Sequence, residues 1–245
     1  LQRNYRTNIN GALLTKNGTI EVETEAAFSN TDNDVNVTNI SAKTPGELQN
    51  KILAEINAGT FNTRQQAYIK LTDAVTANAV IDLTLKDGNA EVTDNDLPRL
   101  LSFEFVKDVT GGTTTIKLPE AYTGTVNVKT QSGESNVLVD ASGASVYTDG
   151  TYGILTVSSG GNTCNIASTA RITTLNVEKG NLIVPKNATI GTININAGAG
   201  DYAEYASIAA NVTINVNKTG GHNLRLIGGS STTAVNVTEG GSNVE

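Results

Sequence analysis

The segment ITTLNVEKGNLIVPKNATIGTININ, from Ile172 to Asn196, carries the tetrad TLNV near its start and TINI near its end. The same small–apolar–polar–apolar pattern returns as TINV from Thr213 and as AVNV from Ala234, and it occurs earlier as TVNV from Thr125. The central polar residues of the tetrads are Asn127, Thr156, Asn176, Asn194, Asn215 and Asn236, at spacings of 29, 20, 18, 21 and 21 residues. A period near 20 residues, with two or three short strands in each repeat, is typical of a solenoid.

Side chains alternate between the two faces of a β-strand, so the residues on either side of each polar centre are expected to point inward. One coil cannot bury its apolar face alone, whereas stacked coils bury a continuous column. The sequence therefore predicts an all-β fold, a right-handed parallel β-helix with coils of about 20 residues. The residues expected in its buried columns are Val126, Val128, Leu175, Val177, Ile193, Ile195, Ile214, Val216, Val235 and Val237.

The central asparagines are the most regular polar feature of the sequence. We expect Asn176, Asn194, Asn215 and Asn236 to lie in register on one outer face. Two interpretations are open. Their amides could present a flat surface to a glycan, or they could hydrogen-bond to one another along the stack and need no ligand.

One segment has helical rather than strand periodicity. TPGELQNKILAEINAG places apolar residues on one face, with Thr44 as N-cap, Pro45 at the first helical position and Gly59 at the C-terminal end. We predict an amphipathic helix over residues 45–58 that covers the N-terminal end of the stack, where strand edges would otherwise be exposed. The predicted organisation is a strand and loop segment over 1–43, the capping helix within 44–60, and the β-helix over 61–245.

Composition excludes several classes of partner. The chain has 24 glycines, no Met or Trp and four Phe, which suits narrow coils joined by tight turns. Its formal net charge of -7 disfavours nucleic acid. No apolar run approaches the roughly 18 residues of a membrane span. With Cys164 as the single cysteine, no internal disulfide can form.

The phrase TDND occurs twice and suggests a metal site. Paired carboxylates one residue apart can bind calcium. The candidate ligands are Asp32, Asp34, Asp94 and Asp96. Neither copy continues into an EF-hand loop, and a polar turn is the alternative interpretation.

Four tyrosines are the candidate ligand-binding residues. Exposed tyrosine rings can stack on sugar rings, and tyrosine is enriched at binding surfaces. The alternative is that the rings only cover loops of the solenoid. The candidates are Tyr147, Tyr152, Tyr202 and Tyr205.

The sequence contains no recognisable catalytic group. His222 is the single histidine, and no nucleophile-elbow motif is present. The acids of the repeat region, Asp140, Asp149, Glu178, Asp201 and Glu204, do not share one outward column in the alignment of tetrads. General acid–base chemistry needs two such groups near one bond. We therefore expect a protein that is not an enzyme and uses no cofactor. A glycan-active β-helix enzyme, a lyase or hydrolase, is the alternative.

The opening segment LQRNYRTNINGALLT, Leu1 to Thr15, resembles the fimbrillin-like cell-surface adhesins of anaerobic gut bacteria, with the match centred on RNYRTNI from Arg3 to Ile9. The resemblance implies an exported protein at the cell surface or outer membrane, with a lipid anchor upstream. It also implies an adhesin or structural stalk with surface glycans or proteins as partners. The remainder of a pilin module does not follow, and the solenoid pattern takes its place.

Overall fold

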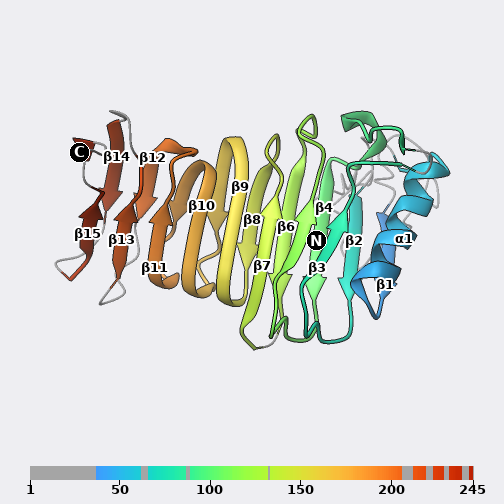
Figure 1. Ribbon diagram of the computed structural model, residues 1–245, viewed down its shortest axis with the longest axis horizontal. Coiled ribbons are helices and arrows are strands. Elements are labelled where there is room, and N and C mark those ends of the chain that lie inside the picture. The colour runs from blue at the N-terminus through green and yellow to red at the C-terminus, as the bar shows by residue number, and fades with distance from the viewer. Residues whose placement is uncertain are drawn as a thin grey trace, which may run out of the picture. The chain divides into compact units, whose positions relative to one another are not determined.

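The computed structural model describes residues 37–61, 66–86, 89–131, 133–205, 212–218, 223–228, 232–238 and 243–244. The predictions for residues 1–36, including Asp32 and Asp34, lie outside this part of the chain. The described strands pair in parallel throughout their ladders and form two walls of a solenoid with coils of about 21 residues, which confirms the predicted fold class. Figure 1 shows the strands standing side by side along the stack.

The two walls are joined by two long strands that turn the corner between them. β9 (Thr151–Ile166) and β10 (Arg171–Val184) contribute their last residues to wall 1 and their earlier residues to wall 2. The other strands of wall 1 are β1 (Val37–Ala42), β2 (Gln66–Leu71), β4 (Leu100–Phe105), β6 (Thr125–Thr130), β8 (Ser145–Asp149), β12 (Ala199–Tyr205), β14 (Asn223–Gly228) and β16 (Asn243–Val244). Those of wall 2 are β3 (Ala79–Asp82), β5 (Thr114–Lys117), β7 (Ser135–Asp140), β11 (Thr189–Ile195), β13 (Thr213–Val216) and β15 (Ala234–Val237).

The tetrads of wall 2 stack in the predicted register. Asn176 pairs with Thr156 on one side and Asn194 on the other, and the column continues through Asn215 to Asn236. Their apolar neighbours point into the lumen, where Leu175, Val177, Ile193, Ile195, Ile214 and Val216 are at most 2% exposed. Branched apolar side chains therefore fill the coil, and the polar centres lie outside.

The asparagine side chains form a continuous ladder along the outside of wall 2. The Asn194 amide donates to Asn176 Oδ1 at 2.7 Å, and the Asn215 amide donates to Asn194 Oδ1 at 2.8 Å. The ladder ends at Asn236, whose amide donates to Asn215 Oδ1 at 2.9 Å. A second, parallel run links Asn196 to Glu178 and Asn217 to Asn196. The amides thus bond to one another, as the ligand-free interpretation requires.

Three tetrad residues do not behave as predicted. Asn127 lies in wall 1, where it pairs with Ser102 and Tyr147, because both walls of a coil have the same alternation and the tetrad alone does not identify the wall. Val235 and Val237 are 42% and 45% exposed instead of buried. They point to the lumen side of β15, and no described strand of wall 2 stacks beyond β15 to cover them.

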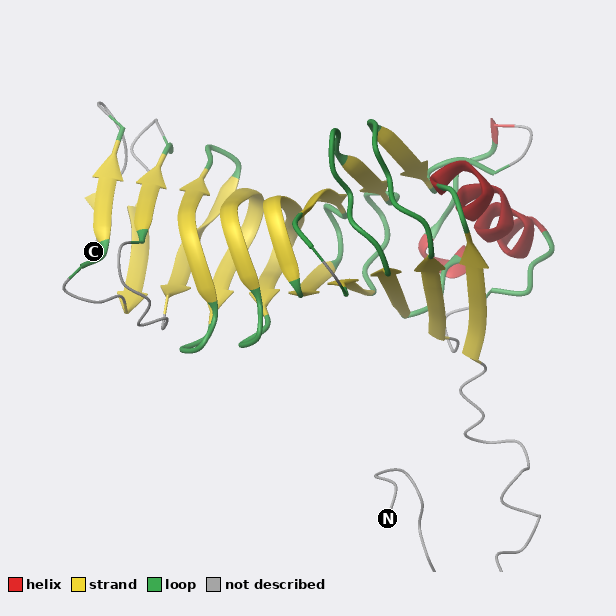
Figure 2. Cartoon of the chain, turned by 90° about the horizontal axis from the view of Figure 1, so that it is seen from below, coloured by secondary structure: helices red, strands yellow, loops and turns green. Residues whose placement is uncertain are grey.

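Helix α1 (Pro45–Asn57) packs its apolar stripe, Leu48, Ile52 and Ile56, against β1, β2 and β3. Thr44 Oγ1 accepts from the Glu47 amide at 3.3 Å. The Glu47 carboxylate reaches the Lys43 amide at 3.2 Å rather than that of Thr44. Figure 2 shows α1 at the end of the row of strands beside β1 and β2, as the capping prediction expects.

The sheet begins earlier in the chain than residue 61. β1 precedes α1 and pairs in parallel with β2 over six residues, so the first strand of wall 1 comes from the segment assigned to 1–43. Contacts group β1, α1 and the solenoid into one unit, Asn36–Glu245. In the described part of the chain, no helix is both long and apolar enough to cross a membrane.

The ladder gives a direct test by substitution. Asn194→Asp should lower the free energy of unfolding by about 1 kcal/mol at pH 7, because the donor to Asn176 is replaced by a carboxylate facing a carbonyl oxygen. The loss should shrink as the pH falls and the introduced group is protonated, since a carboxylic acid can donate. Thermal unfolding measures both effects. Asn236→Asp is the matched control, because it removes the same kind of donor at the exposed end of the ladder, where water can solvate the carboxylate. We expect a smaller loss there, and an equal loss would contradict this account.

Candidate functional site

An open groove of about 770 Å³ lies at the strand ends of wall 2. The groove is lined by the ends of β5 and β7 and the turns after them, by Thr84, Leu85, Glu91 and Val92, and by Lys179 of β10. Its polar lining consists of Thr84, Glu91, Lys117, Glu120, Asp140, Ser142 and Lys179. Leu85, which is 45% exposed, adds apolar surface.

A column of alternating charges leads into the groove. Asp82, Lys117 and Asp140 are the last residues of β3, β5 and β7, and they pair in register across the three strands. Lys117 Nζ lies 3.6 Å from Asp82 Oδ2. Burial opposes ionisation of Asp82, but hydrogen bonds from the Thr84 hydroxyl and amide, together with the charge of Lys117, lower its pKa below the ordinary value. Asp82 is therefore anionic at neutral pH, and Lys117 is held beside the groove.

A second lysine is held by a hydroxyl bridge between coils. Lys179 Nζ donates to Ser142 Oγ at 3.3 Å, and Ser142 Oγ donates to Asp140 Oδ1 at 3.3 Å. An ammonium group has three donors, and this bridge uses one of them. The groove therefore offers both donors and acceptors to a ligand.

Two acids of the groove are exposed and have no partner in the described part of the chain. The side chains of Glu91 and Glu120 make neither a hydrogen bond nor an ion pair with any described residue, and both residues are exposed. Their oxygens are available to accept hydrogen bonds from a ligand. Nothing in the described chain holds either carboxyl group in one orientation.

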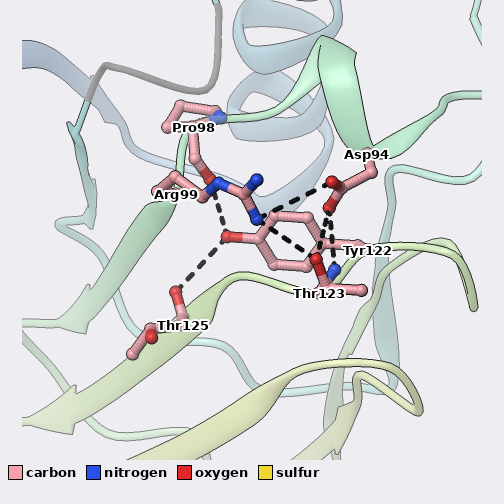
Figure 3. Close-up of polar contacts among 6 residues, drawn as sticks. All are labelled: Asp94, Pro98, Arg99, Tyr122, Thr123 and Thr125. Atoms are coloured by element: carbon pink, nitrogen blue, oxygen red, sulfur yellow. Dashed lines mark hydrogen bonds and ion pairs between the residues drawn. The ribbon is translucent and has the colours of Figure 1, made fainter.

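The predicted metal ligand Asp94 binds the polypeptide instead. Asp94 Oδ1 accepts from the Thr123 amide at 2.8 Å and from its hydroxyl at 3.1 Å, and Asp94 Oδ2 lies 3.7 Å from Arg99 Nη1. Next to it the Tyr122 hydroxyl donates to Pro98 O at 2.7 Å (Figure 3). These contacts fix the turn that carries Glu120 and Ala121 into the groove.

Asp96 has a different set of partners. In the 3₁₀ turn Asp94–Asp96, its Oδ2 accepts from the Thr93 amide at 2.8 Å and hydroxyl at 2.7 Å, and its Oδ1 pairs with Lys86 Nζ at 2.6 Å. The two carboxylates thus do not converge. Among the described residues, no group of three or more His, Cys, Asp or Glu side chains could bind a metal ion. Asp94 and Asp96 instead anchor the segments that line the groove.

Two of the four candidate tyrosines are buried, so their prediction as ligand-binding residues is wrong. Tyr152 and Tyr205 are each 0% exposed. The Tyr152 hydroxyl donates toward Val128 O and Asp149 O, both at 2.9 Å, and burial raises its pKa. Tyr152 pairs with Ile172, which pairs with Ile190, so it occupies the inward position of the recurring Ala–x–Ile motif. That alignment was visible in the sequence and identifies Tyr152 as a lumen residue.

The other two tyrosines point outward on wall 1, away from the lining of the groove. Tyr147 is 48% exposed on β8. Tyr202 on β12 is half-buried, and its hydroxyl donates to Glu204 Oε2 at 3.2 Å. Sequence reasoning also missed the groove itself. The sequence feature that indicates the groove is a charged residue at the end of each of the apolar segments VID, TIK and LVD. These residues are Asp82, Lys117 and Asp140.

Cys164 lies in the lumen, where it is fully buried. Burial raises the pKa of its thiol to about 12, so the thiolate is not populated at neutral pH. A nucleophilic role is therefore not expected.

Comparisons with known proteins give no further guide to function. No protein-family model matches the chain, and neither a curated protein nor a solved structure matches it.

The anchoring role of Asp96 predicts a pH-dependent effect on stability. Burial opposes ionisation of Asp96, but hydrogen bonds from Lys86 and Thr93 outweigh it and lower the pKa of this carboxyl group below 3.8. The ionised side chain therefore stabilises the folded state above pH 3.8, and this contribution is lost as the pH falls through the lowered pKa. Asp96→Asn should cost about 1 kcal/mol at pH 7, and denaturant titration should show the gap to wild type closing in acid. Asp73→Asn removes a 3.9 Å surface contact between Asp73 Oδ1 and Lys107 Nζ, and it should change stability by less than about 0.5 kcal/mol. A gap for Asp96→Asn that persists at pH 2 would contradict the assignment.

Proposed function

We propose that this protein is a non-enzymatic binding protein of the bacterial cell surface, an adhesin or structural stalk, and that it binds a glycan in the groove at the strand ends of wall 2. The observation that carries the proposal is the lining of the groove. Carboxylates and ammonium groups from separate strands and turns line one open cleft of about 770 Å³. Small-ligand sites are typically concave, with a few convergent polar groups.

The mixture of groups favours a hydroxyl-rich ligand. Each sugar hydroxyl both donates and accepts, and the groove offers acceptors at Glu91, Glu120 and Asp140 beside donors at Lys117 and Lys179. The exposed Leu85 supplies apolar surface for the C–H face of a sugar ring. An open groove also admits a long chain, which an enclosed pocket would not.

Binding without cleavage is favoured by the exposure of the acids. A general acid or base must be held within hydrogen-bond reach of the reacting bond. Glu91 and Glu120 are exposed and have no partner in the described chain to hold them. The second candidate is a glycan-active enzyme, because the groove brings together acids and lysines that lie far apart in the sequence.

The location at the cell surface rests on the N-terminal segment. Leu1 to Thr15 resembles fimbrillin-like adhesins, and this resemblance supports export, an anchor upstream and surface glycans or proteins as partners. The formal net charge of -7 supports the absence of nucleic acid among those partners.

The test combines a glycan array with calorimetry of the purified chain. For any glycan that binds, Glu120→Gln and Lys179→Ala should each weaken affinity about tenfold, because each removes hydrogen bonds to the ligand. Glu134→Gln is the matched control, an exposed acid outside the groove lining that should leave affinity unchanged.

Two outcomes would redirect the proposal. If Tyr147→Ala lowers affinity while the groove variants do not, the glycan binds wall 1. If the glycan is recovered as shorter products, and Glu120→Gln or Glu91→Gln abolishes the shortening, the groove is an active site and the enzyme interpretation is correct.

A further inference from the structure

The outer face of β2, β4, β6 and β8 in wall 1, which we call the β2–β8 face, carries three columns of outward side chains. They follow from the parallel pairing of these strands in strict register. The first column is Gln66, Leu100, Thr125 and Ser145; the second is Tyr68, Ser102, Asn127 and Tyr147; the third is Lys70, Glu104, Lys129 and Asp149.

The second and third columns are each complementary to a second copy of the same column in which the order of the strands is reversed. The third column alternates in sign, so reading it backwards sets Lys70 against Asp149 and Glu104 against Lys129. The second column has a tyrosine at each end and small polar residues between. Reversal therefore sets tyrosine against tyrosine and Ser102 against Asn127.

Such a reversal is what one two-fold axis produces. An axis that runs parallel to the strands, midway between β4 and β6, turns one copy over onto the other. Residues at the same position along their strands then face one another, and the strand order is reversed, so that β2 lies over the partner's β8 and β4 over the partner's β6. Such a contact, made by the same surface of both copies, is the interface of a symmetric dimer. Lys70 then faces the partner's Asp149, and Glu104 faces the partner's Lys129.

We propose that the β2–β8 face binds a second copy of this chain across that two-fold axis, with the partner's strand order reversed. The proposal goes beyond glycan binding, which uses the groove of wall 2. The occupant is identified by charge complementarity: a copy of the same surface matches each charge with its opposite and each tyrosine with another ring. Tyrosine is enriched at protein interfaces, and paired aromatic rings attract one another.

The tyrosines and lysines of this face are exposed, whereas Asp149 is half-buried and its Oδ1 accepts from the Gly150 amide at 2.8 Å and from the Thr169 hydroxyl at 2.6 Å. Tyr68 and Tyr147 are 47% and 48% exposed. Lys129 is exposed and makes no hydrogen bond or ion pair with any described residue. Lys70 Nζ lies 2.9 Å from Glu104 Oε2, yet its side chain remains 46% exposed.

Pairing within the chain offers a simpler account of the alternating charges. Opposite charges on neighbouring strands stabilise a sheet, and the Lys70–Glu104 ion pair is such a contact. That account leaves the two exposed tyrosines at mirrored positions unexplained. It also makes a different prediction for exchanged charges, so the two accounts can be separated.

The size of the face limits the affinity. Three strand spacings and six residues of strand give about 14 Å by 20 Å, and β1 can add to it. The two copies together would bury roughly 560 Å², which is below the roughly 1,200 Å² at which specific, stable interfaces begin, so this contact is a weak, transient one. We therefore expect a dimer with Kd on the order of 10–100 μM, which a crowded surface would populate.

Sedimentation velocity on the full chain tests the proposal. Wild type should shift from monomer to dimer as its concentration rises through the tens of micromolar, and added salt should weaken the dimer. K70E and D149K should each weaken it at least about tenfold, because each places like charges in contact twice per dimer. A mixture of K70E and D149K chains should dimerise again, since each variant restores opposite charges on the other.

The double variant K70E/D149K separates contact between copies from pairing within the chain. Inside one chain it places like charges side by side, whereas between copies it restores every opposite pair. A wild-type-like dimer therefore supports the interface, provided circular dichroism shows each variant folded. Wild type that stays monomeric up to about 1 mM would overturn the proposal. So would a dimer that both single variants leave unchanged, or single variants whose mixture fails to dimerise.

Discussion

Each coil of this protein is too thin to bury its own apolar side chains, and stacking on the next coil is what removes them from water. Columns such as Leu155, Leu175, Ile193 and Ile214 run through the lumen at 0 to 1% exposure. A column of this kind forms only if successive strands stay in register, because a slip of one residue would turn every apolar side chain outward. The periodic spacing of the tetrads is the sequence counterpart of this requirement.

Register within the lumen also orders the outside of each wall. Since alternate residues point in opposite directions, fixing the inner columns aligns the outer ones as well. The chemistry of each outer surface depends on which residues occupy the outward positions. Asparagines along wall 2 satisfy one another, the charged ends of β3, β5 and β7 line a groove, and tyrosines and alternating charges lie on the β2–β8 face. One packing rule thus produces an inert ladder and two surfaces with chemistry available to a partner.

The features that the sequence predicts well are those repeated from coil to coil. The wall of tetrads, the asparagine register and the helix over residues 45–58 depend on local periodicity or on capping residues, and periodicity is readable from one sequence. Asn127 was assigned to the wrong wall because alternation is the same in both walls. The groove was missed for a related reason. Its residues come from strand ends and from turns of unequal length, and Glu91, Glu120 and Lys179 come together only once the coils are stacked.

The candidate ligand residues show that residue type alone does not identify a binding site when burial is unknown. Tyr152 has an inward position, whereas Tyr147 has the same side chain on an outward one, and alignment to the repeat distinguishes them. Asp94 and Asp96 have the spacing of a calcium loop, yet each carboxylate is already used by neighbouring backbone and hydroxyl groups. The chemistry of a site thus depends on which donors remain free after folding.

The central claim is that the groove, and no other surface of the described chain, is where a glycan binds. Hydrogen–deuterium exchange with and without a saturating glycan tests it most directly, because bound ligand slows exchange of the amides it covers. We expect protection at Thr84, Leu85, Glu91 and Val92 and in residues 118–121, which line the groove, and unchanged exchange along the strands of wall 1. Protection confined to β8 and β12, where Tyr147 and Tyr202 lie, would contradict the claim.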